Sequence, residues 1–402
     1  MVISLATSNR VTKIPFFDLK RQFDPLREEI LSELADVCDS QVFILGPKVE
    51  ALESEIAKLC GADCAIGTSS GTDAELLILM ALGIGPGDAV VTTPFTFFAT
   101  AGCVTRLGAR PIFVDIDPKT FNMAPDRLAE LFATQCAEDE EGLKTRDGLH
   151  IRAVLPVHLF GLACAMDELR DICRKYRVPI IEDAAQAIGA EYWSRSGVEK
   201  IGSIGDYSFL SFYPTKNLGA FGDAGIVVTR RTEMGRRMKV LRNHGMEPRY
   251  YHRLVGGNFR LDALQAAILL KKLPHLHKWS KRRWQIAQLY KRELASLEPT
   301  IELPVEPFAD RLGSRGHIYH QFVIRTSKRN ELRDYLSAAG IGTEIYYPVA
   351  LHRQECFAEL EVSNLPEAER AANEVLALPI FPELTEDEIL IVAEAVKRFF
   401  RK

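Results

Sequence analysis

Short apolar runs alternate with helical stretches between residues 64 and 230 of this 402-residue chain. Most of the runs are continuously apolar, which is typical of strands buried on both faces of a parallel sheet. Several are separated by helical stretches such as GTDAELLILMALG and MDELRDICRKY. The pattern therefore predicts an α/β fold in which helices flank a mostly parallel, seven-stranded sheet. Its strands are expected in CAIGT, DAVVTTP, RPIFVDI, RAVLPVHLFG, VPIIEDA, DYSFLSF and GIVVTR.

Two amphipathic helices are predicted before this region. Residues 25–38 and 47–61 carry apolar side chains at helical spacing, and both begin with proline, which suits a first helical turn. One polar stretch interrupts the strand pattern. Residues 135–150, QCAEDEEGLKTRDGLH, are expected to form a solvated excursion before the next strand.

The chain changes character beyond about residue 260, where it becomes predominantly helical. A smaller mixed unit follows, with strands expected in HQFVIRT and TEIYY and helices near 329–339 and 383–400. We therefore expect a large domain over residues 1–275 and a smaller C-terminal α+β domain over residues 276–402.

Composition narrows the function classes. The 50 basic and 54 acidic residues are well mixed, so they indicate neither a nucleic-acid nor a membrane-surface footprint. No apolar run reaches the roughly 18 residues of a membrane span, and the opening MVISLATSNR lacks the pattern of a signal peptide. Eight scattered cysteines without CxxC spacing predict reduced thiols in a cytoplasmic protein. The histidines show no metal-ligand spacing, so no metal site is predicted.

The segment AIGTSSGTDAELL turns from a strand into a helix through small residues. The free N–H groups and the dipole of such a helix start suit a phosphate. The same turn also fits an ordinary tight connection in which Thr72 or Asp73 caps the helix. A third interpretation is a serine hydrolase, because Gly67 to Gly71 matches the G-x-S-x-G nucleophile elbow with Ser69 as nucleophile.

Two further segments end predicted strands with side chains that suit a flat ligand. In VPIIEDAAQAIGA, Asp183 ends an apolar run, where a carboxylate is costly unless it meets a cation or several donors. It could cap the next helix or pair with a protonated ring nitrogen, and Gln186 follows one helical turn later. The phenylalanines of TPFTFFAT are candidates for the core, and one of them could stack on a ring.

The segment SFYPTKNLGAFGDAG places a single lysine, Lys216, between two apolar strands. Partial burial lowers the pKa of a lysine, which makes it a usable nucleophile and base near neutral pH. Glycines at positions 219, 222 and 225 let the backbone turn tightly around it. A phosphate cradle, a ring stacker, a carboxylate for a ring nitrogen and a Schiff-base lysine together predict a site for pyridoxal 5'-phosphate.

In wording and spacing the chain resembles the nucleotide-sugar aminotransferases of the DegT/StrS type, from residue 15 to the C-terminus. The resemblance implies the aspartate-aminotransferase-like fold, which is fold type I of the pyridoxal phosphate enzymes. An ordered set of motifs carries it: PFFDLKRQ, GPKVEALE, SSGTDAE, TPFTFFAT, PVHLFG, IEDAAQA, SFYPTKNLGAFGDAG and GGNFRLDALQAA.

The resemblance also implies roles for individual residues. Lys216 is expected to bind the coenzyme covalently, and Asp183 to pair with its pyridine nitrogen. Gln186 is expected near the ring hydroxyl and Phe97 on the ring face. Asn258 is expected to reach the phosphate of the neighbouring subunit's coenzyme, which makes the active unit a homodimer. The phosphate contacts within the subunit are expected from Gly71, Thr72 and Ser211.

The implied reaction is a ping-pong transamination, in which L-glutamate leaves as 2-oxoglutarate and a keto group on a nucleotide-linked deoxyhexose is aminated. Lys216 favours this reaction, because dehydratase relatives have histidine in its place. The run HGMEPRYYHRLVGGNFRLD resembles members that aminate C3, including those acting on UDP-linked 2-acetamido-3-keto sugars. Amination at C4 is the alternative, and a coenzyme-binding sensor without turnover is a second one. The roles common among members of this family imply a part in bacterial surface-glycan synthesis, such as that of lipopolysaccharide.

Candidate substrate contacts lie in two aromatic segments and in the lysine loop. Tyr213 departs from the common form of its motif, since many relatives have histidine there. The other candidates occur in the run RYYHR and in YYPVALH, and both segments could equally be surface loop or interface packing. The candidates are Tyr213, Tyr250, Tyr251, His252, Tyr346 and His352.

Overall fold

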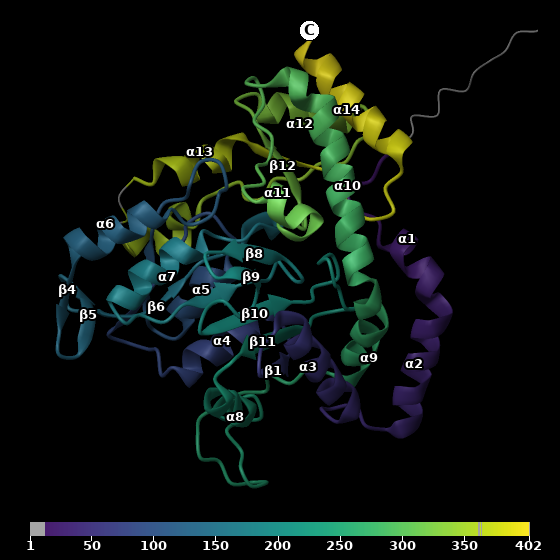
Figure 1. The fold of residues 1–402 in the computed structure, drawn as a ribbon. Helices are drawn as coiled ribbons and strands as arrows, with labels where there is room; N and C mark the ends of the chain where they lie inside the picture. Colours follow the sequence, from purple (N-terminus) through teal and green to yellow (C-terminus); the bar gives the residue numbers. More distant parts are fainter. Residues whose placement is uncertain (1–12, 361, 363, 402) are drawn as a thin grey trace, which may run out of the picture.

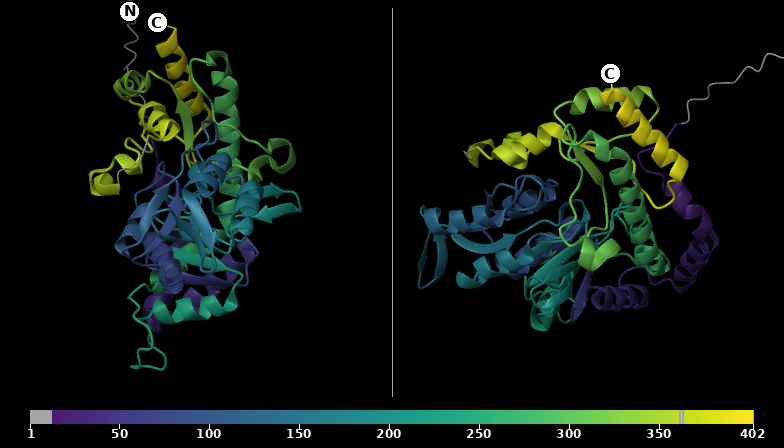
Figure 2. Two further views of the ribbon diagram at one scale, coloured as in Figure 1. Left: turned by 90° about the vertical axis from the view of Figure 1, so that its left-hand side faces the viewer. Right: turned by 45° about the horizontal axis from the view of Figure 1, so that its top comes forward.

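The computed structural model describes residues 13–360, 362 and 364–401. The opening segment MVISLATSNR, which is not expected to be a signal peptide, lies outside the described residues. At the centre of Figure 1 is a sheet, and the C-terminal elements, coloured green to yellow, lie at one end of the molecule in Figures 1 and 2. Among the described residues, no helix combines the length and apolar character that crossing a bilayer requires.

Seven strands form the central sheet in the order β3-β2-β6-β7-β10-β11-β1. Parallel bridges Val154–Ile180 and Val157–Asp183 join its two halves between β6 and β7. Only β11 runs antiparallel to its neighbours, so the prediction of a mostly parallel seven-stranded sheet is confirmed. The strands are β1 (Cys64–Thr68), β2 (Asp88–Thr92), β3 (Arg110–Phe113), β6 (His150–Leu155), β7 (Ile181–Asp183), β10 (Tyr207–Ser211) and β11 (Gly225–Thr229).

Helices cover both faces of this sheet, as the continuously apolar strands require. On one face α3 (Pro47–Cys60), α6 (Pro125–Gln135), α7 (Met166–Lys175) and α9 (Ala263–Lys272) share a core with Ile226 and Val228. On the other face α4 (Gly71–Ala81), α5 (Ala99–Arg106) and α8 (Thr232–Leu241) share a core with Val227. Consecutive residues of β11 therefore enter opposite cores, which explains why its sequence does not alternate.

The N-terminal helices agree with the sequence pattern. The first predicted one is α2 (Arg27–Ser40), preceded by α1 (Leu19–Phe23) and the short 3-10 helix η1 (Asp24–Leu26), and the second is α3. The stretch expected as a solvated excursion is ordered into a hairpin of β4 (Cys136–Asp139) and β5 (Gly142–Thr145). Its side chains are mostly exposed, so solvation was predicted but the backbone pairing was missed.

The C-terminal unit has its own core around a two-stranded antiparallel sheet, β12 (Phe322–Arg325) with β13 (Val375–Leu378). The expected strand TEIYY is reduced to one bridge, Glu344–Ala377. Ile14 joins this core and pairs with Ile341, so a segment that precedes the first helix contributes to the C-terminal unit. The domain boundary near residue 275 stays a prediction. The surrounding helices are α10 (Leu276–Leu294), α11 (Ala309–Leu312), α12 (Arg329–Ala338), α13 (Pro366–Glu374) and α14 (Glu386–Phe400).

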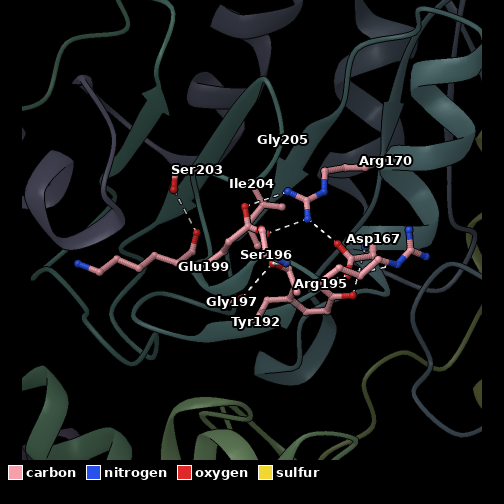
Figure 3. A network of polar contacts seen from close by, with 12 residues as sticks. Asp167, Arg170, Tyr192, Arg195, Ser196, Gly197, Glu199, Ser203, Ile204 and Gly205 are labelled. Atoms are coloured by element: carbon pink, nitrogen blue, oxygen red, sulfur yellow. Dashed lines mark hydrogen bonds and ion pairs between the residues drawn. The ribbon is translucent and has the colours of Figure 1, made fainter.

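A hairpin of β8 (Glu191–Ser194) and β9 (Gly197–Lys200) is fastened to α7 by a polar network, which Figure 3 shows from close by. Arg170 donates two hydrogen bonds to Glu199, at 2.9 and 2.8 Å, and one to Asp167 at 2.6 Å. Asp167 also accepts from the backbone N–H of Arg195 and donates its own backbone N–H to the Tyr192 hydroxyl. Every charge in the network therefore faces an opposite charge or a donor.

Candidate active site

The site lies where neighbouring strands end, which is where open α/β sheets bind ligands. Asp183 is the last residue of β7 and is paired with Phe209 of β10. Ser211 ends β10, and the lysine loop follows it. At the end of β1 the chain turns directly into α4. The topology therefore brings the ends of β1, β7 and β10 to one edge of the sheet.

Asp183 is a buried carboxylate at the end of β7. Its Oδ2 accepts a hydrogen bond of 3.0 Å from the Thr100 hydroxyl, and its Oδ1 accepts one of 3.1 Å from the backbone N–H of Ala185. Asp183 is only 5% exposed, and it forms no ion pair among the described residues. Burial therefore raises the pKa of Asp183 above its usual value, against the smaller opposing effects of these donors. A protonated ring nitrogen would supply the missing positive charge.

Lys216 lies in the loop after β10, where its backbone N–H donates to the Tyr213 carbonyl at 2.8 Å. Its side chain is partly buried, and within the described part of the chain its ammonium group has no hydrogen bond or ion pair. Burial lowers its pKa from 10.5 to about 8, and the attraction of Asp183 opposes that change. An amine with this pKa is partly unprotonated near neutral pH, as an imine-forming lysine must be.

The start of α4 forms a narrow cradle. A Cβ atom on Gly71 would lie 2.8 Å from the Cβ of Ser211, and one on Gly225 would lie 2.3 Å from the Ser70 carbonyl oxygen. The helix is capped by Ser70, whose hydroxyl accepts from Asp73 N–H at 3.0 Å, so the expectation of a cap from Thr72 or Asp73 is wrong. The first N–H groups of the helix, at Gly71 and Thr72, have no intrahelical acceptors and remain available for an anion.

Two predicted ring contacts lie beside Tyr347, a residue that the sequence analysis did not single out. Gln186 accepts from Phe160 N–H at 2.7 Å and donates to the Tyr347 hydroxyl at 3.1 Å. The rings of Phe97 and Tyr347 are 6.3 Å apart, and Phe97 is 57% exposed, so one face is free for a flat ligand. The segment YYPVALH had indicated the region, but nothing in it distinguishes Tyr347 from Tyr346.

A second layer supports Asp183 from behind. The backbone N–H of His158 donates to the backbone carbonyl of Asp183 at 3.0 Å, and the ring Nε2 of His158 lies 3.0 Å from the Glu182 carboxylate. Because His158 Nδ1 accepts from Cys164 N–H, we assign the ring proton to Nε2, which donates to Glu182. Thr100 and His158 were missed as site residues, although both lie within motifs, TPFTFFAT and PVHLFG, that the sequence analysis quoted.

The remaining candidates are not joined to Lys216 or Asp183 by any contact within the described subunit. Tyr251 and His252 lie in a loop that extends beyond α8 in Figure 1, where Tyr251 is 70% exposed. Asn258, at the other end of this loop, is exposed and bridges to Asn243. His352 is buried elsewhere, with Nε2 2.9 Å from the Glu369 carboxylate.

Tyr213 lies in the loop that carries Lys216, and Tyr346 lies near enough to Tyr213 to interact with it electrostatically. Tyr213 is 53% exposed, and burial together with Glu344 and Tyr213 raises the pKa of Tyr346 to about 12. The serine-hydrolase alternative finds no support, because the Ser69 hydroxyl donates to the Asp73 carboxylate and contacts no histidine among the described residues. The described histidines, cysteines and carboxylates also form no group of three or more that could hold a metal ion.

Comparisons with known proteins agree with this arrangement. A "Pleiotropic regulatory protein" of Geobacillus stearothermophilus is 44% identical over 96% of this chain and 99% of its own length. A "UDP-N-acetyl-3-dehydro-alpha-D-glucosamine 3-aminotranferase" of Acidithiobacillus ferrooxidans is 41% identical over 96% and 98%. The crystal structure of NtdA from Bacillus subtilis with bound cofactor PMP superposes with a TM-score of 0.85 at 31% identity, covering 98% of this chain and 87% of that one.

The family model of the DegT/DnrJ/EryC1/StrS aminotransferases matches residues 24–397. This match spans the sheet, the lysine loop and the C-terminal unit, so the fold and the resemblance expected from the sequence are confirmed. A coenzyme of the pyridoxal phosphate type follows from the same comparisons. The chain belongs to the DegT/DnrJ/EryC1/StrS aminotransferase family.

Proposed function

We propose that this aminotransferase uses pyridoxal 5'-phosphate to move the amino group of L-glutamate onto the C3 keto group of a UDP-linked 2-acetamido sugar. The observation that carries the proposal is the placement of Asp183 at the end of β7 and of Lys216 in the loop after the adjacent strand β10, where the two side chains attract each other. Burial shifts the pKa of each side chain toward its uncharged form, although their mutual attraction opposes both shifts, and neither forms an ion pair among the described residues. A coenzyme with a protonated ring nitrogen would suit the Asp183 carboxylate, and its carbonyl group would suit the Lys216 amine.

The residues at the strand ends fit this coenzyme. The Asp183 carboxylate would hold the protonated ring nitrogen, and the start of α4 with Ser211 would hold the phosphate. Phe97 would lie on the ring face and Gln186 near the ring hydroxyl. When bound, the coenzyme supplies an electron-withdrawing ring that stabilises negative charge on the reacting carbon.

Lys216 would move the proton. With a pKa of about 8, its Nζ can accept a proton from the reacting carbon and return it within the same site near neutral pH. Thr100 keeps the Asp183 carboxylate oriented, and the His158–Glu182 pair fixes the backbone that bears it. The protein thus contributes a proton carrier, an anion for the ring and a rigid support.

The sugar substrate is inferred from relatives. The Acidithiobacillus protein, 41% identical, is named as a 3-aminotransferase of a UDP-N-acetyl-3-keto sugar, and this favours C3 over C4. We propose Tyr213, Tyr346 and Tyr347 as substrate contacts, with Tyr251 and His252 supplied across a homodimer. Asn258 would reach the coenzyme phosphate of the neighbouring subunit. His352 fits a packing role better, because Glu369 occupies its Nε2. We place the enzyme in the cytoplasm, in surface-glycan synthesis.

A second candidate is a coenzyme-binding regulator without turnover. One observation favours it: the Geobacillus relative, 44% identical, is described as a pleiotropic regulatory protein. Both candidates predict a yellow protein, so colour alone does not separate them.

The deciding experiment has two stages. First, borohydride reduction of the loaded protein should bleach it and leave a mass adduct on Lys216, which Lys216→Arg should lack. Second, the reverse reaction with 2-oxoglutarate should consume a UDP-linked 3-amino sugar and spare UDP- and dTDP-linked 4-amino sugars. Without an adduct on Lys216 the coenzyme assignment is wrong. An adduct without conversion by glutamate indicates the regulator, and consumption of a 4-amino sugar overturns the C3 assignment.

A further inference from the structure

Lys272, at the end of α9, is a buried cation that bonds to the lysine loop. The residue is 3% exposed, and its Nζ donates to the Gly219 carbonyl at 2.5 Å. Gly219 is three positions after Lys216. No described carboxylate forms an ion pair with Lys272, and its ammonium instead lies 5.7 Å from the ring centre of Phe221 and 6.0 Å from that of Trp279.

The loop that Lys272 holds is folded tightly on itself. Ala220 N–H donates to the Phe212 carbonyl at 2.7 Å, and Lys216 N–H donates to the Tyr213 carbonyl at 2.8 Å. A Cβ atom on Gly219 would lie 2.2 Å from the Pro214 carbonyl oxygen, so the backbone segments on either side of Lys216 are in direct contact. A shift of Gly219 would therefore displace the backbone on both sides of Lys216.

Further bonds hold the loop at other points. From α9, Gln265 accepts from Phe221 N–H at 2.9 Å. On the other side of the loop, Asn217 donates to the Ile318 carbonyl at 3.2 Å and lies 3.1 Å from His320 Nδ1. Lys272 is the charged member of this set, and it bonds to the segment between these attachment points.

A buried ammonium is a poor choice for stability alone. Burial lowers the pKa of Lys272 to about 8, because an apolar environment disfavours the charged ammonium. Replacement of buried charges by apolar groups of similar size is often neutral or stabilising. Its location against the lysine loop therefore calls for a reason other than packing.

We propose that Lys272 is a positioning residue, whose hydrogen bond to the Gly219 carbonyl fixes the loop so that the Lys216 amine faces Asp183. This inference rests on the proposed role of Lys216. Lys272 itself touches neither coenzyme nor substrate in this account. Hydrogen bonds to charged groups are stronger than neutral ones, so its loss should loosen the loop about tenfold.

The test compares Lys272→Met with Arg329→Met in the full chain. Arg329 is a matched control, because it is also buried and donates to backbone carbonyls, those of Ala372 and Val375, in the C-terminal unit. In coenzyme-free protein, amide hydrogen exchange of peptides covering residues 212–222 should be about tenfold faster in Lys272→Met than in wild type. After loading with pyridoxal phosphate, release of the coenzyme should also be about tenfold faster, while Arg329→Met leaves both rates unchanged.

Three outcomes overturn the proposal: unchanged exchange and release in Lys272→Met, faster exchange throughout the chain instead of in the loop, or equal effects in Arg329→Met. If Lys272→Met does not fold, Lys272→Gln decides, because it keeps a shorter donor and should change both rates in the same direction by less. Failure of both variants to fold assigns Lys272 to the fold and also overturns the proposal. An absent borohydride adduct on Lys216 in wild type would refute the proposed function, whereas the exchange result for Lys272 would stand.

Discussion

Two buried aspartates of this protein have opposite surroundings. Asp167, 9% exposed, lies 2.6 Å from the Arg170 guanidinium in the network of Figure 3. Asp183, 5% exposed, has one hydroxyl and one backbone donor and no ion pair among the described residues. The two aspartates are buried to a similar extent, so the difference in their electrostatic environment comes from their partners.

The pKa shifts show what this difference does. In the network, the hydrogen bonds from Arg170 to Glu199 raise the pKa of the Arg170 guanidinium. Burial alone would raise the pKa of Glu199, but its hydrogen bonds and the charge of Arg170 together outweigh burial, and the pKa of Glu199 is lowered. Both shifts favour the charged forms. In the site, burial raises the pKa of Asp183 and lowers that of Lys216, which favours the neutral forms. Groups that are ion-paired within the protein stabilise the fold. Buried ionisable groups without ion pairs in the described part of the chain, such as Asp183 and Lys216, can instead gain electrostatic stabilisation from a bound ligand.

The largest expected effect is on Lys216. Lys216→Ala removes both the covalent attachment point and the proton carrier, so kcat should fall by about a thousandfold or more. Single-turnover absorbance measurements with glutamate would follow this loss. Full activity in the variant would show that another group moves the proton.

The second largest effect is expected for a substitution of Asp183. Asp183→Asn leaves the ring nitrogen without an anion, and loss of one member of a buried charge pair costs about 3 kcal/mol or more. We expect kcat to fall about 100-fold and coenzyme affinity to fall with it, measured by turnover and by equilibrium dialysis. Asp167→Asn is the matched control and should leave kcat within about twofold, since its role is local fastening. Equal losses in both variants would contradict the distinction drawn between them.

A pH measurement sharpens the same comparison. In coenzyme-free protein, only the unprotonated Lys216 amine can attack pyridoxal phosphate. Because its pKa is lowered to about 8, the rate of covalent recombination should rise with pH up to about 8 and level off above it. Stopped-flow absorbance from pH 6 to about 10.5 covers both limbs, the upper limit being the ordinary lysine pKa. A rate that keeps rising to that limit would mean that the amine is exposed to water.

The smallest effect is expected in the network. Glu199→Gln removes the bidentate partner of Arg170, which is 22% exposed at its side chain, so unfolding free energy should fall by about 1 kcal/mol. Chemical denaturation would measure the loss, and kcat should be unchanged. A change in kcat without a change in stability would mean that the β8–β9 hairpin contributes to the site.

The sequence predicted the fold well and the details of the site unevenly. Continuous apolar runs fixed the seven strands, because burial on both faces leaves a local signature. The β4–β5 hairpin was missed because its exposed residues carry no such pattern. At the site, the unusual groups stood out locally, as Lys216 did between two apolar strands. The choice between Tyr346 and Tyr347 did not, since adjacent tyrosines look alike in sequence.

By itself the sequence determined where strands and helices alternate, which family the motifs resemble and which segments carry a lone lysine and a strand-ending aspartate. Only the tertiary structure decided which side chains meet. Thr100 reaches Asp183 across 83 residues, Gln186 reaches Tyr347 across 161, and Lys272 reaches Gly219 across 53. The physical reason is range: burial periodicity and turn chemistry act over a few residues, whereas these contacts depend on how the whole sheet and its helices pack.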